Sequence, residues 1–207
     1  MRNPRILTWL GQELSAPNGK HLIVGRPGIV FFNDGGTHLL PTPNKGTVAA
    51  MDASNYRYLW TCDDADWSGA WDGTTADYSG WIVQGLYFTD YVTNTARLFK
   101  DCTWLRQVDA GLYTFGNAGT FKNVTNAESM FEGCTGLYND SSYLLFSLKL
   151  DNCALMYKNC SNMVPTLAHG IYTKLSSLNP SIHHECFTGC GGDLQHIPAS
   201  WGGTGNG

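Results

Sequence analysis

Oxygen-bearing side chains alternate in the stretch DADWSG, which begins at Asp64, in a way that could bind a calcium ion. Asp64, Asp66 and Ser68 occupy positions 1, 3 and 5 of a calcium-binding loop, and a glycine follows at position 6. Asp72 stands at position 9, but position 12, where such loops carry a bidentate glutamate, is Thr75. Two interpretations follow: a calcium site that lacks one ligand, or a solvated acidic loop.

Tryptophan is concentrated in the same part of the chain. Residues 58–96 contain six aspartates, no lysine or arginine, and four of the seven tryptophans. Exposed indole rings stack on the flat faces of sugars, and carboxylates accept hydrogen bonds from sugar hydroxyls. One interpretation is therefore a glycan or partner contact site, and the other is that these side chains fill the core or an interface. The four residues are Trp60, Trp67, Trp71 and Trp81.

Thiol and imidazole groups cluster in the stretch HHECFTGC, residues 183–190. Both groups bind zinc, but structural zinc sites usually contain Cys-x-x-Cys pairs, and the chain has none. We therefore do not expect zinc here. The candidate ligands are His183, His184, Cys186, Cys190 and His196.

The sequence signatures of common catalytic sites are missing. There is no Gly-x-Ser-x-Gly, no His-Glu-x-x-His and no glycine-rich phosphate loop with its lysine. Two aspartates beside tryptophan could hydrolyse a glycoside, because that reaction needs only two carboxylates and a surface that holds the sugar. We predict a protein that is not an enzyme and has no cofactor, with a glycan-cleaving enzyme as an alternative.

A repeated pattern accounts for most of the cysteines. Residues 92–105 (VTNTARLFKDCTWL) and 124–137 (VTNAESMFEGCTGL) share Val-Thr-Asn, an aromatic, a cysteine and a leucine at the same spacings. Further copies at 150–163 and 180–194 place the cysteines 32, 26 and 30 residues apart, a period typical of repeat proteins. The predicted repeat core is Phe99, Cys102, Leu105, Phe131, Cys134, Leu137, Tyr157, Cys160, Met163, Phe187, Cys190 and Leu194.

The columns of this alignment predict a small unit that stacks on its neighbours. An asparagine at the head of a copy is suited to cap a short helix of about two turns. The apolar residue, the aromatic and the cysteine lie on one face of that helix, where a small buried thiol permits close stacking. The following Leu105 and Val108, like Leu194 and Ile197, suit a short extended segment. The predicted helix caps are Asn94, Asn126 and Asn152.

This pattern resembles the BspA-like leucine-rich repeats of bacterial, protozoan and phage-encoded surface proteins. The resemblance covers about residues 90–203, and its last part, HIPASWGG at 196–203, is similar to the end of such arrays. It implies an α+β fold, a short leucine-rich-repeat-like solenoid with a short helix and a short strand in each unit. It also implies a role in interaction or adhesion, without catalytic residues.

The chain is predicted to have four parts. Residues 1–56 form a β-containing cap or docking segment, because two apolar runs flank the turn signal GRPG. Residues 57–90 form the Asp/Trp-rich loop region, residues 91–203 the repeats, and residues 204–207 a glycine-rich tail.

Composition restricts the environment in which the protein works. Charged residues make up 14% of the chain, against about 25% in an average soluble domain, and the net charge of −4 comes without a basic stripe for nucleic acid. We expect a soluble chain that is not exported, because no apolar run is long enough for a membrane span or a signal peptide. The odd number of cysteines, seven, argues against a complete disulfide framework.

These observations favour a non-enzymatic component of a bacteriophage virion, such as a capsid decoration, head fibre or tail protein. A bacterial cell-surface adhesin is the alternative, and a glycan-binding protein is a third. The expected partners are other virion or surface proteins and a host-surface glycan or protein. The last copy runs directly into WGGTGNG without a polar cap, so we expect a second subunit or a partner to cover that end near Trp201.

Overall fold

A computed structural model describes residues 8–9, 12–13, 28–34, 38–50, 58–62, 64–88, 92–108, 123–138 and 149–206. Its strands are β1 (Thr8–Trp9), β2 (Gln12–Glu13), β3 (Gly28–Asn33), β4 (Thr47–Ala50), β5 (Tyr58–Cys62), β6 (Trp81–Phe88) and β7 (Leu105–Val108). Its helices are α1 (Pro165–Leu178) and the short 3-10 helix η1 (Ala199–Trp201).

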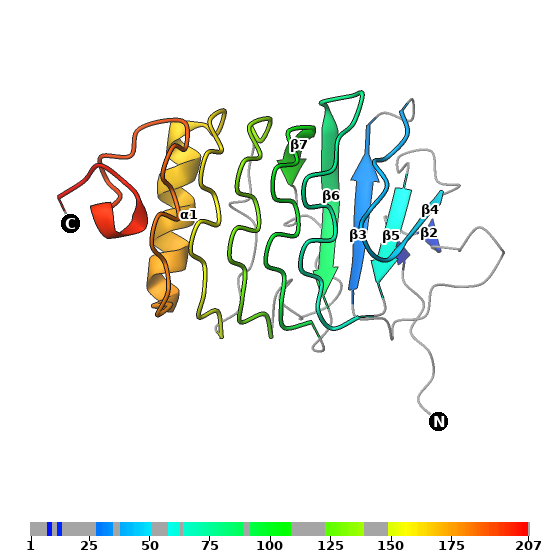
Figure 1. Cartoon of the computed structure of the whole chain (residues 1–207), viewed down its shortest axis with the longest axis horizontal. Coiled ribbons are helices and arrows are strands. Elements are labelled where there is room, and N and C mark those ends of the chain that lie inside the picture. Colours follow the sequence, from blue (N-terminus) through cyan, green and yellow to red (C-terminus); the bar gives the residue numbers. More distant parts are fainter. Residues whose placement is uncertain are drawn as a thin grey trace.

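Five of these strands form one sheet in the order β4-β5-β3-β6-β7 (Figure 1). β3 pairs antiparallel with β5 and β6, whereas β7 pairs parallel with β6. The register of β3 on β6 shifts by one residue between Phe31 and Phe32. Because side chains alternate along a strand, this bulge moves the buried set of β6 from Trp81 and Val83 to Leu86 and Phe88. The sheet thus keeps an apolar face along its whole length.

The N-terminal half of the chain contributes the centre of this sheet. β3 falls on the second apolar run of the segment predicted to contain β structure, and the first run lies outside the described residues. The prediction of a loop over residues 57–90 is wrong, since β5 and β6 lie there and flank β3. One buried apolar cluster runs from Val30 to Trp201.

Five turn segments lie side by side in a row that begins across the sheet at β6 and ends at α1 (Figure 1). Their backbones are joined by parallel bridges and by hydrogen bonds between alternate residues, such as the one from the N–H of Phe99 to the carbonyl of Met130 (2.9 Å). Each bridge joins one segment to the next: Asp66 to Asn94, Asn94 to Asn126, Asn126 to Asn152, and Asn152 to Ile182.

The segments are successions of tight turns, and the prediction of a short helix in each copy is wrong. N–H groups bond to carbonyls three residues back, for example Cys102 to Phe99 (3.1 Å). Arg97 and Asp101 have φ values of 57° and 58°, and a left-handed residue in each turn is incompatible with a right-handed helix. The predicted caps Asn94, Asn126 and Asn152 instead close turns, because each side-chain oxygen accepts the N–H two residues further on at 3.0 Å.

A left-handed position near the end of each segment alternates between glycine and a short polar residue. Asp101 and Asn159 have positive φ, and Gly133 and Gly189 occupy the same position in the segments that follow them. A Cβ on Gly133 would lie 2.1 Å from Oδ1 of Asp101, and one on Gly189 would lie 2.5 Å from Oδ1 of Asn159. The side chain of one turn therefore fills the space that the next turn leaves empty.

Replacing Gly133 with alanine is expected to lower the free energy of unfolding by about 1–3 kcal/mol, because the new Cβ meets both an unfavourable φ of 72° and the Asp101 carboxylate. Gly170 provides a matched control. It lies in α1 with no atom within 4 Å of a new Cβ, so Gly170→Ala should stabilise by about 0.5–1 kcal/mol. Urea denaturation measures both changes, and the same sign for both would contradict the tight stacking of the turns.

The interior of the turns is a column of stacked aromatic rings. Phe131 lies 5.8 Å from Phe99 and 5.3 Å from Tyr157, with ring planes within 20° of parallel. Trp71 begins the column and Phe187 ends it, at 6.0 Å and 5.8 Å from their neighbours, and all five rings are fully buried. The burial of these five large rings is the main stabilising contribution of the turns.

A column of cysteines runs beside the rings. The thiol of Cys134 donates to the carbonyl oxygen of Phe99 in the preceding segment at 2.9 Å. Cys102, Cys160 and Cys190 make the same bond to the aromatic residue of their preceding segments, at 2.8–3.0 Å. All seven cysteines are free and buried. Cysteine suits this position because it is small, apolar and a weak donor.

The chain's own C-terminal residues cover the last turn, so the prediction of an open end is wrong. The N–H of Phe187 donates to the carbonyl of Trp201 (2.9 Å), and the Trp201 ring stacks on His183 at 4.3 Å. Tyr172 of α1 contacts both Phe187 and Trp201 edge to face. In the described part of the chain, neither helix has the length and apolar character needed to cross a bilayer.

Candidate binding groove

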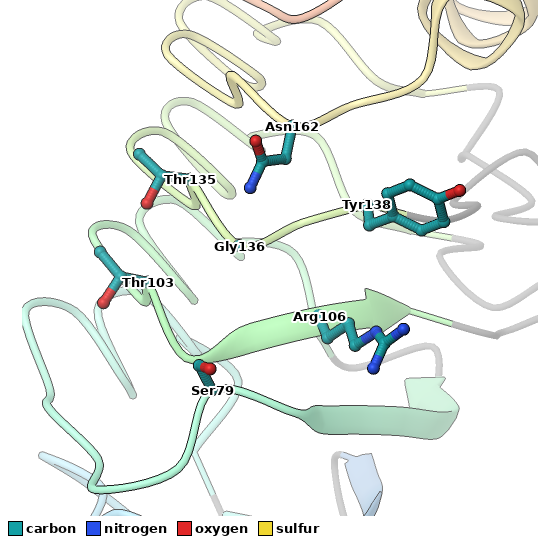
Figure 2. A pocket seen from close by; sticks show the side chains of 7 residues that line it. All are labelled: Ser79, Thr103, Arg106, Thr135, Gly136, Tyr138 and Asn162. Atoms are coloured by element: carbon teal, nitrogen blue, oxygen red, sulfur yellow. The ribbon is translucent and has the colours of Figure 1, made fainter.

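An open polar groove of about 470 Å³ crosses several turns on one side of the molecule (Figure 2). Its size is within the range of small-ligand sites. The lining residues are Ser79, Thr103, Arg106, Thr135, Gly136, Tyr138 and Asn162.

Two walls of the groove arise from equivalent positions in neighbouring turns. Thr103 and Thr135 directly follow the column cysteines Cys102 and Cys134, and because those thiols point inward, the threonines are exposed. Arg106 in β7 and Tyr138 lie on the other side of the groove, and both are exposed. Figure 2 shows the threonines on one side and Arg106 and Tyr138 together on the other.

The floor of the groove depends on a glycine. A Cβ on Gly136 would lie 2.3 Å from the carbonyl oxygen of Thr103 and 3.1 Å from that of Leu105. The N–H of Tyr138 then donates to the carbonyl of Arg106 (2.9 Å). The close approach at Gly136 therefore brings Tyr138 beside Arg106.

Arg106 carries a positive charge that no acidic group within the described ranges neutralises. Other cations on the turns are paired: Lys100 with Glu132 (2.8 Å) and Lys158 with Glu185 (2.5 Å). Hydrogen bonds from Lys158 lower the pKa of Glu185, whereas for Glu132 partial burial acts to raise the pKa and the bonds from Lys100 and Ser129 lower it overall. Arg97 is paired with Asp72. Among the described residues, the groove thus holds a guanidinium without an acidic partner beside neutral polar groups.

The four tryptophans proposed for sugar or partner contact are core residues. Trp60, Trp67, Trp71 and Trp81 are 0% exposed, so none can meet a ligand from solvent. The indole of Trp60 donates to the carbonyl of Lys45 (3.0 Å), that of Trp67 to Asp64 (2.7 Å), and that of Trp71 to Pro41 (3.0 Å). The contact interpretation is therefore wrong, and the core interpretation describes these residues.

The calcium-loop pattern belongs to the first turn segment. The carboxylate of Asp66 accepts the N–H of Ser68 (2.9 Å), as the asparagines do in later segments, and Asp64 accepts the N–H of Asp66 (3.0 Å). Asp72 instead faces Arg97. Alternating oxygens here close turns, and Asp64, Asp66, Ser68 and Asp72 are not brought together as ion ligands.

The candidate zinc ligands are likewise separated by their places in the turns. Cys186 and Cys190 are buried, and the Cys190 thiol is bonded to the carbonyl of Tyr157 at 2.8 Å. His183 stacks on Trp201, whereas His184 and His196 are exposed. Across the described residues, no three His, Cys, Asp or Glu side chains are placed to bind a metal ion.

Burial also decides the chemistry of the column cysteines. It raises the pKa of Cys190 to about 12, and it raises those of Cys102, Cys134, Cys160 and Cys186 as well. At neutral pH these groups are buried thiols, fully so except for Cys190, which is 9% exposed. Among the remaining predicted core residues, Leu105, Leu137 and Met163 are buried, and Leu194 is half-buried against the core.

The groove was not predicted from the sequence, although one signal for it was present. A hydroxyl residue directly follows three cysteines of the pattern, as Thr103, Thr135 and Ser161. All three are exposed. Comparison of the chain with protein-family models, curated proteins and solved structures finds no match.

Proposed function

We propose that the protein is a non-enzymatic binding module in which the turn segments form a short solenoid similar to leucine-rich repeats. The parallel bridges between five segments and the continuous aromatic column support the solenoid, since the buried ring of each segment stacks on that of the next. The class is α+β, with the sheet containing β3 at one end and α1 near the other.

The groove is the observation that carries the binding function. Its side chains include the Arg106 guanidinium, which has no acidic partner in the described part of the chain, and the ring of Tyr138, which is 54% exposed. Most of the large apolar side chains elsewhere on the described turns are buried, and Ile182 on the last turn is 41% exposed. An exposed aromatic beside a free charge is typical of a contact surface.

The protein's setting is proposed to be a bacteriophage virion, where the module contacts a host surface or another virion protein. The low content of charged side chains, 14%, supports a role in assembly or surface contact. A bacterial cell-surface adhesin is the second setting. In both settings the protein is expected to act as a homo-oligomer or within a larger assembly.

Co-sedimentation with washed bacterial cell envelopes tests the proposal. The wild-type protein is expected to sediment with envelopes of at least one species in a mixed Gram-positive and Gram-negative panel. Arg106→Gln combined with Tyr138→Ala should reduce the bound fraction at least tenfold, because it removes the two anchoring groups. Lys174→Gln combined with Leu39→Ala, which removes an exposed charge and an exposed apolar side chain elsewhere, should leave binding unchanged.

Equal sedimentation of both double variants would contradict the groove as the contact site, as would a failure of the wild-type protein to sediment with any envelope. Release of reducing sugar during the same incubation would instead support the glycan-cleaving alternative.

A further inference from the structure

We propose that the groove binds an acidic oligosaccharide, with a sugar carboxylate on Arg106 and a sugar ring on Tyr138. This inference rests on the proposed binding function and specifies its ligand. Three features of the groove carry it: one cation without an acidic partner among the described residues, one exposed aromatic ring on the same side, and hydroxyl and amide groups along the rest of its lining.

The cation specifies an acidic ligand. A guanidinium is a planar donor that binds a carboxylate through two parallel hydrogen bonds. Arg106 is exposed and has no acidic partner in the part of the chain that is described, while Arg97, Lys100 and Lys158 are each paired with a carboxylate. The other lining residues that the structure describes are neutral. An anionic group entering the groove therefore meets a single attractive charge and no nearby competing acid among the lining residues.

The aromatic ring specifies a flat partner beside the anion. Tyr138 is 54% exposed, and the bond from its N–H to the Arg106 carbonyl (2.9 Å) makes the two residues neighbours on adjacent extended segments. Such segments are about 4.8 Å apart. A pyranose ring stacked on Tyr138 can thus extend a carboxylate attached to that ring, or to the next one, toward Arg106. Figure 2 shows both side chains on the same side of the groove.

The rest of the lining is suited to sugar hydroxyls. Thr103 and Thr135 present hydroxyl groups that both donate and accept, Ser79 adds another, and the Asn162 amide supplies two donors and an acceptor. Thr103 and Thr135 occupy the same position in neighbouring turns, so this part of the lining repeats along the stack. Among the described residues no aliphatic side chain lines the groove, which disfavours a peptide, since peptide grooves use apolar pockets for side chains.

The test is isothermal titration of the full chain with carboxylated oligosaccharides and their uncharged counterparts. The acidic probes are oligomers of galacturonate, alginate, hyaluronan and polysialic acid, and each is compared with its own methyl ester. At least one acid is expected to bind about tenfold or more tightly than its ester, because a carboxylate forms a charge-assisted bidentate pair with the guanidinium and an ester does not. Raising the salt concentration to about 0.5 M should weaken the acid and leave the ester unchanged.

Matched variants assign the two contacts. Arg106→Gln should lower the affinity for the acid to that for the ester, whereas Lys174→Gln, the same charge change on α1, should have no effect. Tyr138→Ala should weaken acid and ester alike by about tenfold, and Tyr138→Phe should retain most of the affinity because the ring face remains. Thermal melting of each variant checks that it is folded.

The outcomes separate this inference from the proposed function. Equal binding of acids and esters, unchanged by Arg106→Gln, would overturn the acidic ligand. If no acid binds but envelope sedimentation still depends on Arg106 and Tyr138, the oligosaccharide is wrong and the binding groove stands. If no acid binds and sedimentation is also insensitive to the groove, both proposals fail.

Discussion

Replacing Phe131 with alanine is expected to lower the free energy of unfolding by about 3–5 kcal/mol, the range for a large aromatic lost from a tightly packed core. The ring is 0% exposed and lies between Phe99 at 5.8 Å and Tyr157 at 5.3 Å. Its removal leaves a cavity in the middle of the column that neighbouring turns cannot close, because their backbones are hydrogen-bonded in register. Urea denaturation monitored by tryptophan fluorescence measures the change.

Two controls show whether the loss comes from the column. Tyr138→Ala removes an aromatic ring that is 54% exposed and should change stability by no more than about 0.5 kcal/mol. Phe131→Leu keeps most of the buried volume and should cost less than the alanine variant. If Phe131→Ala and Tyr138→Ala were equally mild, the aromatic column would not be the core of the turns.

Raising the pH above 9 under reducing conditions is expected to unfold the protein cooperatively. Burial raises the pKa of the thiols of Cys102, Cys134, Cys160, Cys186 and Cys190 above their ordinary value of 9.0, and that of Cys190 reaches about 12. Between these values the unfolded chain loses thiol protons that the folded chain keeps. The folded state then binds more protons, so stability, complete below pH 9, falls as the pH rises.

The size of this effect follows from the number of thiols. Above pH 9 each thiol lowers the free energy of unfolding with a slope that approaches 1.4 kcal/mol per pH unit. Five thiols therefore lower the free energy of unfolding by about 7 kcal/mol by pH 10. That is comparable to the total stability of an ordinary domain, about 5–15 kcal/mol. We therefore expect the midpoint of alkaline unfolding at about pH 10–10.5. Circular dichroism in the presence of a reductant measures it.

The variant Cys134→Ala separates the thiols from other groups that titrate in this range. Its stability at pH 7 is expected to be lower, but its loss between pH 8 and pH 10 should be smaller than that of the wild type by about 1.4 kcal/mol. All other side chains are the same in both proteins, so their contributions cancel in the comparison. Identical pH slopes for the two proteins would show that the buried thiols do not control alkaline stability.

Sequence spacing indicated which side chains repeat, and the extended segment expected to begin at Leu105 is confirmed as β7 (Leu105–Val108). It did not indicate the conformation that joins them. An asparagine at the head of a segment closes an Asx turn as readily as it caps a helix. The difference lies in left-handed residues such as Arg97 and Leu155, which are not glycine and carry no local signal. Contacts with the neighbouring turns hold these conformations.

Local composition misled the interpretation of the Asp/Trp region for a related reason. Trp67 and Trp71 alternate with acidic residues along the chain, which suggests a surface loop, yet the turn directs the indoles inward and Asp66 outward. The groove was still harder to predict from the sequence. Arg106 and Tyr138 are separated by 32 positions and become neighbours only through the pairing of adjacent segments. Thr103 and Thr135 converge for the same reason.

The groove exists only if the turns stack on one another, since stacking brings Thr103, Thr135 and Asn162 together. NMR scalar couplings across hydrogen bonds test this directly, because each coupling identifies the carbonyl that a given N–H contacts. The account predicts a coupling from the Phe99 amide nitrogen to the Met130 carbonyl carbon, and another from Phe131 to Met156. A coupling from Phe131 to Ala127, four residues back as in an α-helix, would contradict it.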